Sequence, residues 1–332
     1  MSHSHAVKFM PLLGIAAIGM FGANTVFAAE TGPAAPNNLP NPYQAVENWA
    51  KLPPGVEWGR VINVAPDAHG NIWVFHRSDP AIMEFDSSGK YIKGFGAGMF
   101  VEAHGFTIDR DGNIWATDQK TKDGKGQQVF KFSPDGKVLM KMGKAGVTGD
   151  GPDTFNNPSS VVVAPNGDIF VGNGHGGDTN ARVVKFSKDG KFIKAWGKKG
   201  TGPGEFDQLH SMAMDSKGRI FVADRGNSRI QIFDQDGKFL DQWKQFGRPS
   251  GVFISKDDTL YSVDSQSGDK VNPGVKRGIR IGSAKDGVVK YFIPDTSANP
   301  KVALAEGVSA DAKGDVYAAG VSSMGLHKFL KK

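Results

Sequence analysis

DAHGNIWVF (67–75) combines a glycine-containing turn with a strand of aromatic and β-branched residues, and variants of it recur along the chain. The other copies are DRDGNIWAT (109–117), APNGDIFVG (164–172), DSKGRIFVA (215–223), KDDTLYSVD (256–264) and DAKGDVYAA (311–319). The turn positions 70, 112, 167, 218, 258 and 314 are 40–56 residues apart. Repeats of this period indicate a modular architecture in which each copy is one supersecondary unit.

A second turn-and-strand unit follows most of these copies. It reads FDSSGKYI (85–92), FSPDGKVL (132–139), FSKDGKFI (186–193) and FDQDGKFL (233–240), with a weaker version, IGSAKDGVV (281–289). Each repeat therefore predicts four antiparallel strands joined by tight turns, and no segment shows a helical period. Six such units predict an all-β, six-bladed β-propeller. The last copy ends after its third strand, so we expect residues near 44–50 to supply its outer strand and close the ring.

The chain divides into three segments. Residues 1–28 form a predicted signal peptide, since Lys8 precedes a long apolar stretch that ends in a small-residue cleavage pattern at Ala28. A retained membrane anchor is the alternative interpretation. Residues 29–43 are a Pro-rich linker and residues 44–332 are the propeller. We therefore expect a periplasmic or secreted protein without stable membrane insertion once the signal is removed.

The composition excludes several classes of protein. The 332 residues include no cysteine, which excludes disulfides and cysteine-based zinc or redox chemistry. The net charge of +6 is spread along the chain, with lysines recurring beside the turns, so no basic patch argues for nucleic acid. We expect a monomer whose partner is a small-molecule or peptide substrate.

The repeat also fixes a register for the innermost strands, which line the axis of a propeller. Eight positions before the turn position of each blade lie Ile62, His104, Ser159, His210, Ser250 and Glu306. His104, His210 and Glu306 fall on alternate blades, so we expect their side chains to converge on one point of the axis. Two imidazoles and a carboxylate suit Zn²⁺ with one position left open, and Fe²⁺ and Mn²⁺ are alternatives. The other interpretation is three separately hydrogen-bonded side chains in a wet channel.

The loops that leave the second strand of each blade should open at the same end of the channel. They carry Arg77, His175 and Arg225. Two arginines above a metal suit a carboxylate or a developing anionic oxygen, while ion pairing with Asp79 or Asp224 is the plainer interpretation. His175 is a candidate general base, although its flanking glycines also fit an ordinary loop residue.

These residues resemble the NHL-repeat propellers and, within them, the peptidyl-α-hydroxyglycine α-amidating lyases. The most specific stretches are VFHRSD (74–79), AHGFTIDRDGNIWATD (103–118), GEFDQLHSMAMD (204–215) and VADRGNSRIQIF (222–233). The resemblance implies a zinc ion on three channel histidines, with an arginine and a tyrosine acting on the hydroxyglycine end of the substrate. It also implies cleavage of the N–Cα bond of a carbinolamide, giving a peptide amide and glyoxylate.

By this resemblance, His104 and His210 match the first two zinc histidines, and Arg77 matches the substrate arginine. Arg225 matches the arginine that follows the VAD strand. The third zinc histidine of the family falls on Glu306, which adds negative charge to the expected site and makes a bound ion a weaker Lewis acid.

Two further departures concern calcium and the catalytic tyrosine. The aspartate that is a calcium ligand in the family falls on Gly307, so calcium is in doubt. The tyrosine falls at or near His175, which becomes the expected proton-transfer group.

Together these observations predict an exported, metal-dependent, lyase-like enzyme acting on a small carboxylate-bearing substrate. The predicted cofactor is Zn²⁺ or another divalent transition metal on His104, His210 and Glu306. A non-catalytic NHL-repeat propeller that serves as a protein- or peptide-binding scaffold is the alternative, since fold alone permits it. A calcium-dependent lactonase-like propeller is a third possibility, and it requires several acidic or amide ligands where this register has one carboxylate.

Overall fold

The computed structural model describes residues 1–3, 34–177, 179–297, 299 and 301–332. Nearly all of the expected signal peptide and the first part of the linker lie outside these residues. The described residues from 34 onward form twenty-four strands and no helix. No helix of the described part is long and apolar enough to cross a membrane.

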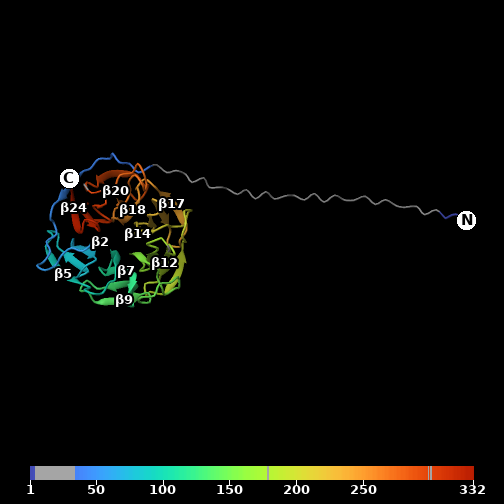
Figure 1. Ribbon diagram of the computed structural model, residues 1–332, viewed down its shortest axis with the longest axis horizontal. Helices are drawn as coiled ribbons and strands as arrows, with labels where there is room; N and C mark the ends of the chain where they lie inside the picture. Colours follow the sequence, from blue (N-terminus) through green and yellow to red (C-terminus); the bar gives the residue numbers. More distant parts are fainter. Residues whose placement is uncertain (4–33, 178, 298, 300) are drawn as a thin grey trace. The chain divides into compact units, whose positions relative to one another are not determined.

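The strands make six four-stranded antiparallel sheets arranged around a common centre (Figure 1). The first strands are β2 (Val61–Pro66), β6 (Ala103–Ile108), β10 (Pro158–Val163), β14 (Leu209–Met214), β18 (Pro249–Ile254) and β22 (Gly307–Ala310). The second strands are β3 (Ile72–His76), β7 (Ile114–Lys122), β11 (Ile169–Asn173), β15 (Ile220–Asp224), β19 (Thr259–Asp264) and β23 (Val316–Gly320). The predicted all-β, six-bladed propeller is confirmed.

The outer half of each blade completes the sheet. The third strands are β4 (Ile82–Phe85), β8 (Lys125–Phe132), β12 (Arg182–Phe186), β16 (Arg229–Phe233), β20 (Gly278–Ser283) and β24 (Gly325–Lys331). The fourth strands are β5 (Tyr91–Phe95), β9 (Val138–Met142), β13 (Phe192–Trp196), β17 (Phe239–Trp243), β21 (Val289–Pro294) and β1 (Tyr43–Val46). In Figure 1 the labelled first strands β2, β14 and β18 lie toward the centre, whereas β5, β9 and β17 lie at the rim.

The sixth blade closes the ring with strands from both ends of the propeller. β1 pairs with β24, with Tyr43 opposite Lys331 and Val46 opposite Lys328. The expectation that residues before the first blade supply this strand is confirmed. Trp49 then packs against Tyr317 of the same blade at a ring-centroid distance of 5.2 Å. The edge that β24 would otherwise expose is therefore covered.

The recurring aspartate of the repeat explains why the turn and the aromatic strand occur together. Asp109 Oδ1 accepts hydrogen bonds from the backbone N–H groups of Asp111 and Asn113, which closes the turn. Its Oδ2 accepts a 3.0 Å hydrogen bond from Trp115 Nε1 on the following strand. Gly112 has a φ of 82°, a left-handed conformation that glycine adopts without steric cost. One carboxylate thus links the turn to the aromatic core.

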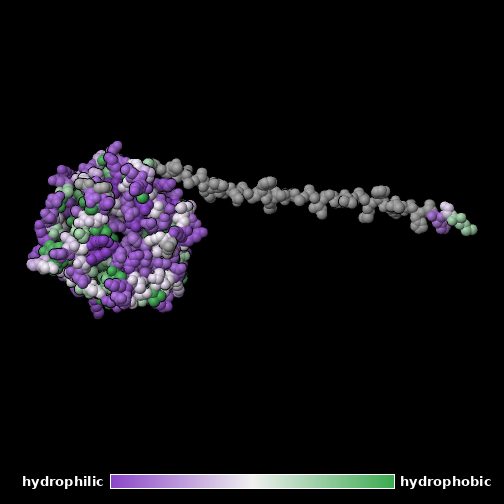
Figure 2. Space-filling model, viewed as in Figure 1, coloured by the Kyte–Doolittle hydropathy of each residue, from purple (hydrophilic) through white to green (hydrophobic). Residues whose placement is uncertain are grey.

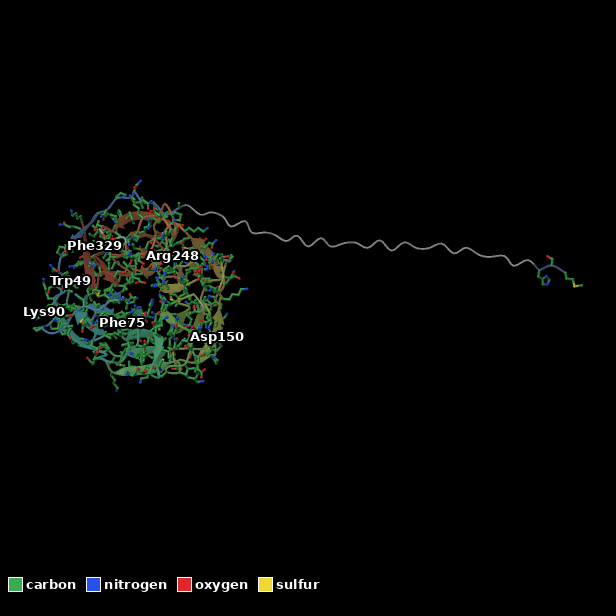
Figure 3. All side chains as sticks on the ribbon, in the orientation of Figure 1. Trp49, Phe75, Lys90, Asp150, Arg248 and Phe329 are labelled. Atoms are coloured by element: carbon green, nitrogen blue, oxygen red, sulfur yellow. The ribbon has the colours of Figure 1, made fainter. Side chains whose placement is uncertain are left out.

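The core lies between the blades. Trp115, Phe170 and Phe221, which occupy equivalent positions of the repeat, are at most 1% exposed. In Figure 3, Phe75 lies well inside the ring, whereas Lys90 lies at its edge. Figure 2 shows a face that is mostly hydrophilic, with small separated apolar spots. The propeller is therefore held by apolar packing between neighbouring sheets, and its chemistry must be sought along the axis.

Candidate metal centre

The predicted ring of axial residues is present at one end of the channel. A narrow cavity of about 10 Å³ on the axis is lined by five of the six residues, namely Ile62, His104, His210, Ser250 and Glu306. In five blades the pairing of the first and second strands shifts register at this position, for example between Leu209 and Ser211. A bulge of this kind interrupts the alternation of side chains between the two faces of the sheet and redirects one side chain. Four of these bulged positions, together with Glu306 just before β22, line the axial cavity.

His104 and His210 are held in the same way by the blade next to each of them. His104 Nδ1 lies 2.7 Å from the carbonyl oxygen of Ser159, and His210 Nδ1 lies 2.6 Å from that of Ser250. Because a carbonyl only accepts, Nδ1 carries the proton in both rings and Nε2 presents a lone pair. The two ring centroids are 4.7 Å apart. A hydrogen bond from the other ring nitrogen to a backbone carbonyl is how metal-binding histidines are commonly oriented.

His175 joins these two rings from the loop after β11. Gly174 and Gly176 on either side have φ values of 116° and 133°, which let the loop turn sharply over the channel. The His175 ring centroid is 4.5 Å from that of His104 and 4.7 Å from that of His210. One nitrogen of each of these three imidazoles lies within 4.8 Å of the others. The residue expected to transfer a proton therefore lies in the histidine cluster.

Glu306 lies beside the cluster but outside the group of three. Its Oε1 is 2.9 Å from His210 Nε2 and accepts a 3.1 Å hydrogen bond from Arg225. The expected set of His104, His210 and Glu306 is thus present at one place, with His175 added to it. The ligand roles themselves stay a prediction.

The donor set fits a cation. Burial and neighbouring positive charges lower the pKa of His104 and His210 well below the usual value and that of His175 to about 2, so all three rings are neutral. The Nε2 atoms of His104 and His210 are buried and have no hydrogen-bond partner. His210 Nε2 and Glu306 Oε1 are two acceptors only 2.9 Å apart, an arrangement that a nearby cation relieves. Neutral imidazoles with oriented lone pairs suit Zn²⁺ and related ions.

A calcium ligand at position 307 does not fit this backbone. A Cβ atom added to Gly307 would lie 2.5 Å from the carbonyl oxygen of Ile62 in the first blade. That contact is with backbone and cannot be relieved by a side-chain rotation. An aspartate cannot be accommodated there without movement of the strand.

Arg225 extends from the end of β15 over the cluster. It is 5% exposed, its guanidinium donates to Glu306 and Gln208, and its Nε is buried without a partner. Desolvation lowers the pKa of Arg225 to about 10, which leaves it charged at neutral pH. The alternative expectation of a pair with Asp224 is wrong, because Asp224 binds Arg229 at 2.7 Å. Arg225 is therefore directed at Glu306 and the histidine cluster.

Arg77 approaches from the first blade. Its Nη1 lies 3.2 Å from Glu102, and its Nε donates a 3.0 Å hydrogen bond to the carbonyl oxygen of Ala103. The ion pair considered with Asp79 is absent, since Asp79 instead accepts a hydrogen bond from the backbone of Gly98. Burial lowers the pKa of Arg77, and the Glu102 and Glu306 carboxylates oppose that shift.

Three residues of the site were not predicted from the sequence. Arg248 donates a 2.6 Å hydrogen bond to the carbonyl oxygen of Arg225 and so supports its loop. Glu102 and Gln208 contact the two arginines, and each lies two positions before a channel histidine. Arg248 likewise lies two positions before the ring residue Ser250, so extending the ring register by two positions would have identified all three residues.

Sequence comparisons agree with this architecture. A family described as "6-bladed beta-propeller" matches residues 155–241. The peptidyl-glycine alpha-amidating monooxygenase of Mus musculus is 34% identical over 202 residues, covering 51% of this chain and 20% of that protein. A probable peptidyl-alpha-hydroxyglycine alpha-amidating lyase of Caenorhabditis elegans is 31% identical, covering 52% of this chain and 55% of that protein. NHL repeat-containing protein 3 of Homo sapiens is 33% identical, covering 56% of this chain and 54% of that protein.

Solved structures of similar fold cover most of the chain. A gluconolactonase from Xanthomonas campestris superposes with a TM-score of 0.59 at 15% identity, over 90% of this chain and 97% of that one. A streptogramin B lyase superposes with a TM-score of 0.57 at 12% identity, over 87% of this chain and 97% of that one. Likenesses at these identities show the fold alone. The chain is a six-bladed β-propeller.

Its relatives at 31–34% identity include proteins named NHL repeat-containing protein and peptidyl-alpha-hydroxyglycine alpha-amidating lyase. The chain spans between a fifth and about half of the length of the curated relatives it matches.

Proposed function

We propose that this propeller is a metal-dependent, lyase-like enzyme that acts outside the cytoplasm, as a monomer, on a small carboxylate-bearing substrate. The observation that supports it is the cluster of His104, His175 and His210, whose nitrogens lie within 4.8 Å of one another. Two of these rings are pre-oriented by backbone carbonyls, and two arginines lie next to them. The amidating lyases named among the relatives provide the reaction class.

The three histidines are assigned as ligands of Zn²⁺ or another divalent transition metal. When bound there, such an ion supplies Lewis acidity toward an oxygen of the substrate. His175 replaces Glu306 as the third proposed ligand, because its ring lies against both other imidazoles. Glu306 is thereby left to hold Arg225 and to contact the substrate.

Arg225 and Arg77 bind the carboxylate of the substrate. Arg225 Nε is buried and has no partner, while its two Nη atoms contact Glu306, His175 and Gln208, so one N–H of the guanidinium is left for a carboxylate. Glu306 Oε1 accepts the proton of the substrate hydroxyl as the hydroxyl-bearing carbon becomes a carbonyl and its bond to nitrogen breaks. The same proton then passes to the departing amide nitrogen. The products are an amide and glyoxylate.

Metal content and turnover test this proposal together. The protein purified without chelator should contain one equivalent of a divalent transition metal and release glyoxylate from an N-acyl-α-hydroxyglycine. EDTA and the variant His104→Ala should each abolish both properties, whereas His69→Ala, which changes an exposed turn histidine, should abolish neither. Turnover that survives complete metal removal contradicts the mechanism.

Glu306→Gln separates its two possible roles. The amide can still accept a hydrogen bond from Arg225 but cannot take up the substrate proton. We expect the variant to retain its metal and to lose turnover by about 10²- to 10⁴-fold, as for removal of a general base. Loss of the metal in Glu306→Gln would instead make Glu306 a ligand, as the sequence predicts.

A non-catalytic scaffold is the second candidate, and the 33% identity to NHL repeat-containing protein 3 supports it. This function predicts a protein or peptide bound at the open face of the ring. Protein that contains no stoichiometric metal and turns over no α-hydroxyglycine compound would favour it over the enzyme.

A further inference from the structure

A large cavity adjoins the metal centre on the side of the fifth and sixth blades. Its volume is about 760 Å³, and Glu306 belongs to both its wall and the cluster. The channel space below the histidines measures only about 10 Å³, enough for a single water molecule. A ligand larger than water that reaches the cluster past Glu306 therefore extends into this cavity, whose volume is typical of small-molecule sites.

The walls of the cavity are fixed by hydrogen bonds. Asp264, at the end of β19, accepts from the backbone N–H and the hydroxyl of Ser267, at 2.9 Å and 2.6 Å. Arg277, which also lines the cavity, lies 3.3 Å from Asp295. Arg248 donates to Gln266, the neighbour of Ser267, and to the carbonyl oxygen of Arg225. The cavity is thus preformed, and Arg248 connects its lining to the loop of Arg225 through hydrogen bonds.

The side chains of the cavity select for a particular chemistry. Ala303, Ala305 and Val321 give it an apolar part. Lys270 and Lys301 lie at its exposed margin, and no ion pair is found for either ammonium group among the described residues. The Glu306 carboxylate is already paired with Arg225, which leaves Asp269 as the other acid of the lining. The cavity thus offers an apolar floor with two available cations beyond it.

We propose that this cavity holds the distal part of the substrate and that the substrate is a dianion. This inference rests on the proposed function for the near end of the ligand. One carboxylate binds Arg225 and Arg77 beside the metal. An apolar spacer lies over Ala303 and Ala305, and a second carboxylate reaches Lys270 and Lys301.

Linear dicarboxylates test this inference directly without requiring turnover. Binding of succinate through suberate is measured by calorimetry on the metal-loaded protein, beside monocarboxylates of equal chain length. We expect the longer dicarboxylates to bind about threefold to tenfold more tightly than their monocarboxylate partners, the range for one or two exposed charge pairs. The double variant Lys270→Glu/Lys301→Glu should abolish this preference and leave monocarboxylate binding unchanged.

Two controls make the result specific to the cavity. Lys137→Glu/Lys313→Glu makes the same change of net charge at exposed turn lysines and should keep the preference. Ser322→Trp, an exposed position in the lining, should weaken long dicarboxylates more than short ones. Equal affinity for mono- and dicarboxylates, or a preference that survives Lys270→Glu/Lys301→Glu, overturns the inference. A preference found in protein that shows no turnover even after loading with Zn²⁺ or another divalent transition metal upholds this site while refuting the metal-dependent reaction.

Discussion

At the scale of single residues, the site depends on which nitrogen of each histidine carries the proton. The carbonyl oxygens of Ser159 and Ser250 fix His104 and His210 with Nε2 as the free acceptor. Placing three neutral rings and a carboxylate oxygen around one point concentrates lone pairs that only a cation or a proton can relieve. Burial disfavours the proton, because a charged imidazole is poorly solvated there.

The lowered pKa values predict how the metal-free protein responds to acid. Below pH about 6.5 the unfolded chain takes up protons on His104 and His210 that the folded chain cannot, so the free energy of unfolding falls as pH falls. The slope should approach about 1.4 kcal/mol per pH unit for each histidine between pH 6.5 and 5. Urea unfolding in EDTA across this interval measures it. His104→Asn should have a shallower dependence, and an unchanged slope would contradict the assignment.

At the scale of elements, four of the six blades, the second among them, carry an aspartate that caps the first turn. Asp109 accepts hydrogen bonds from two backbone N–H groups and from Trp115, and Lys131 lies 3.5 Å away. These partners outweigh the desolvation of the carboxylate and lower the pKa of Asp109. The turn, the aromatic strand and the core between blades are thus joined at one side chain.

Asp109→Ala should destabilise the propeller by about 1–3 kcal/mol, because it leaves a buried indole N–H and turn amides without acceptors. Chemical unfolding followed by tryptophan fluorescence measures the loss. Asp135→Ala is the matched control, since the Asp135 side chain is 92% exposed and its contact with Lys93 is long, at 3.7 Å. Similar losses in both variants would show that the cap contributes nothing beyond an ordinary turn aspartate.

The repeat predicts the blades well because turn chemistry and strand alternation are local properties. The same register placed His104, His210 and Glu306 around one axis, although more than 200 positions separate the first from the last. It could not show that His175 folds over the channel, since that depends on the left-handed glycines of one irregular loop. The partners of Arg77 and Arg225 were also missed, because side chains from other loops decide them.

At the scale of the whole molecule, the ring is held closed by one short strand. β1 contributes four residues, and its pairing with β24 joins the two ends of the propeller. Every other blade is built from consecutive strands, so among the described residues this sheet alone pairs strands from the two ends of the propeller. Opening of the ring should therefore begin here.

A disulfide across this closure should stabilise the protein. Gln44 and Leu330 are exposed and directly opposite each other, and the chain has no cysteine of its own to interfere. Gln44→Cys/Leu330→Cys should raise the free energy of unfolding by about 2–4 kcal/mol under oxidising conditions. Unfolding with and without reductant measures the gain. A crosslink that forms without raising stability would show that the ring opens elsewhere.

The bulges at the mouth of the channel determine which side chains can be substituted without disturbing the blades. Ile62, Ser159 and Ser250 alternate with the residues of the expected metal site, but Ile62 belongs to the apolar core and Ser159 Oγ donates to the carbonyl oxygen of Leu209 in the next blade. Ser250 lines the channel and its hydroxyl bonds to Ser265 of the same blade, so its identity can vary with little effect on the packing between blades. Evolution or design could therefore install a second coordination set, or a new selectivity, by substituting one or a few residues of the ring.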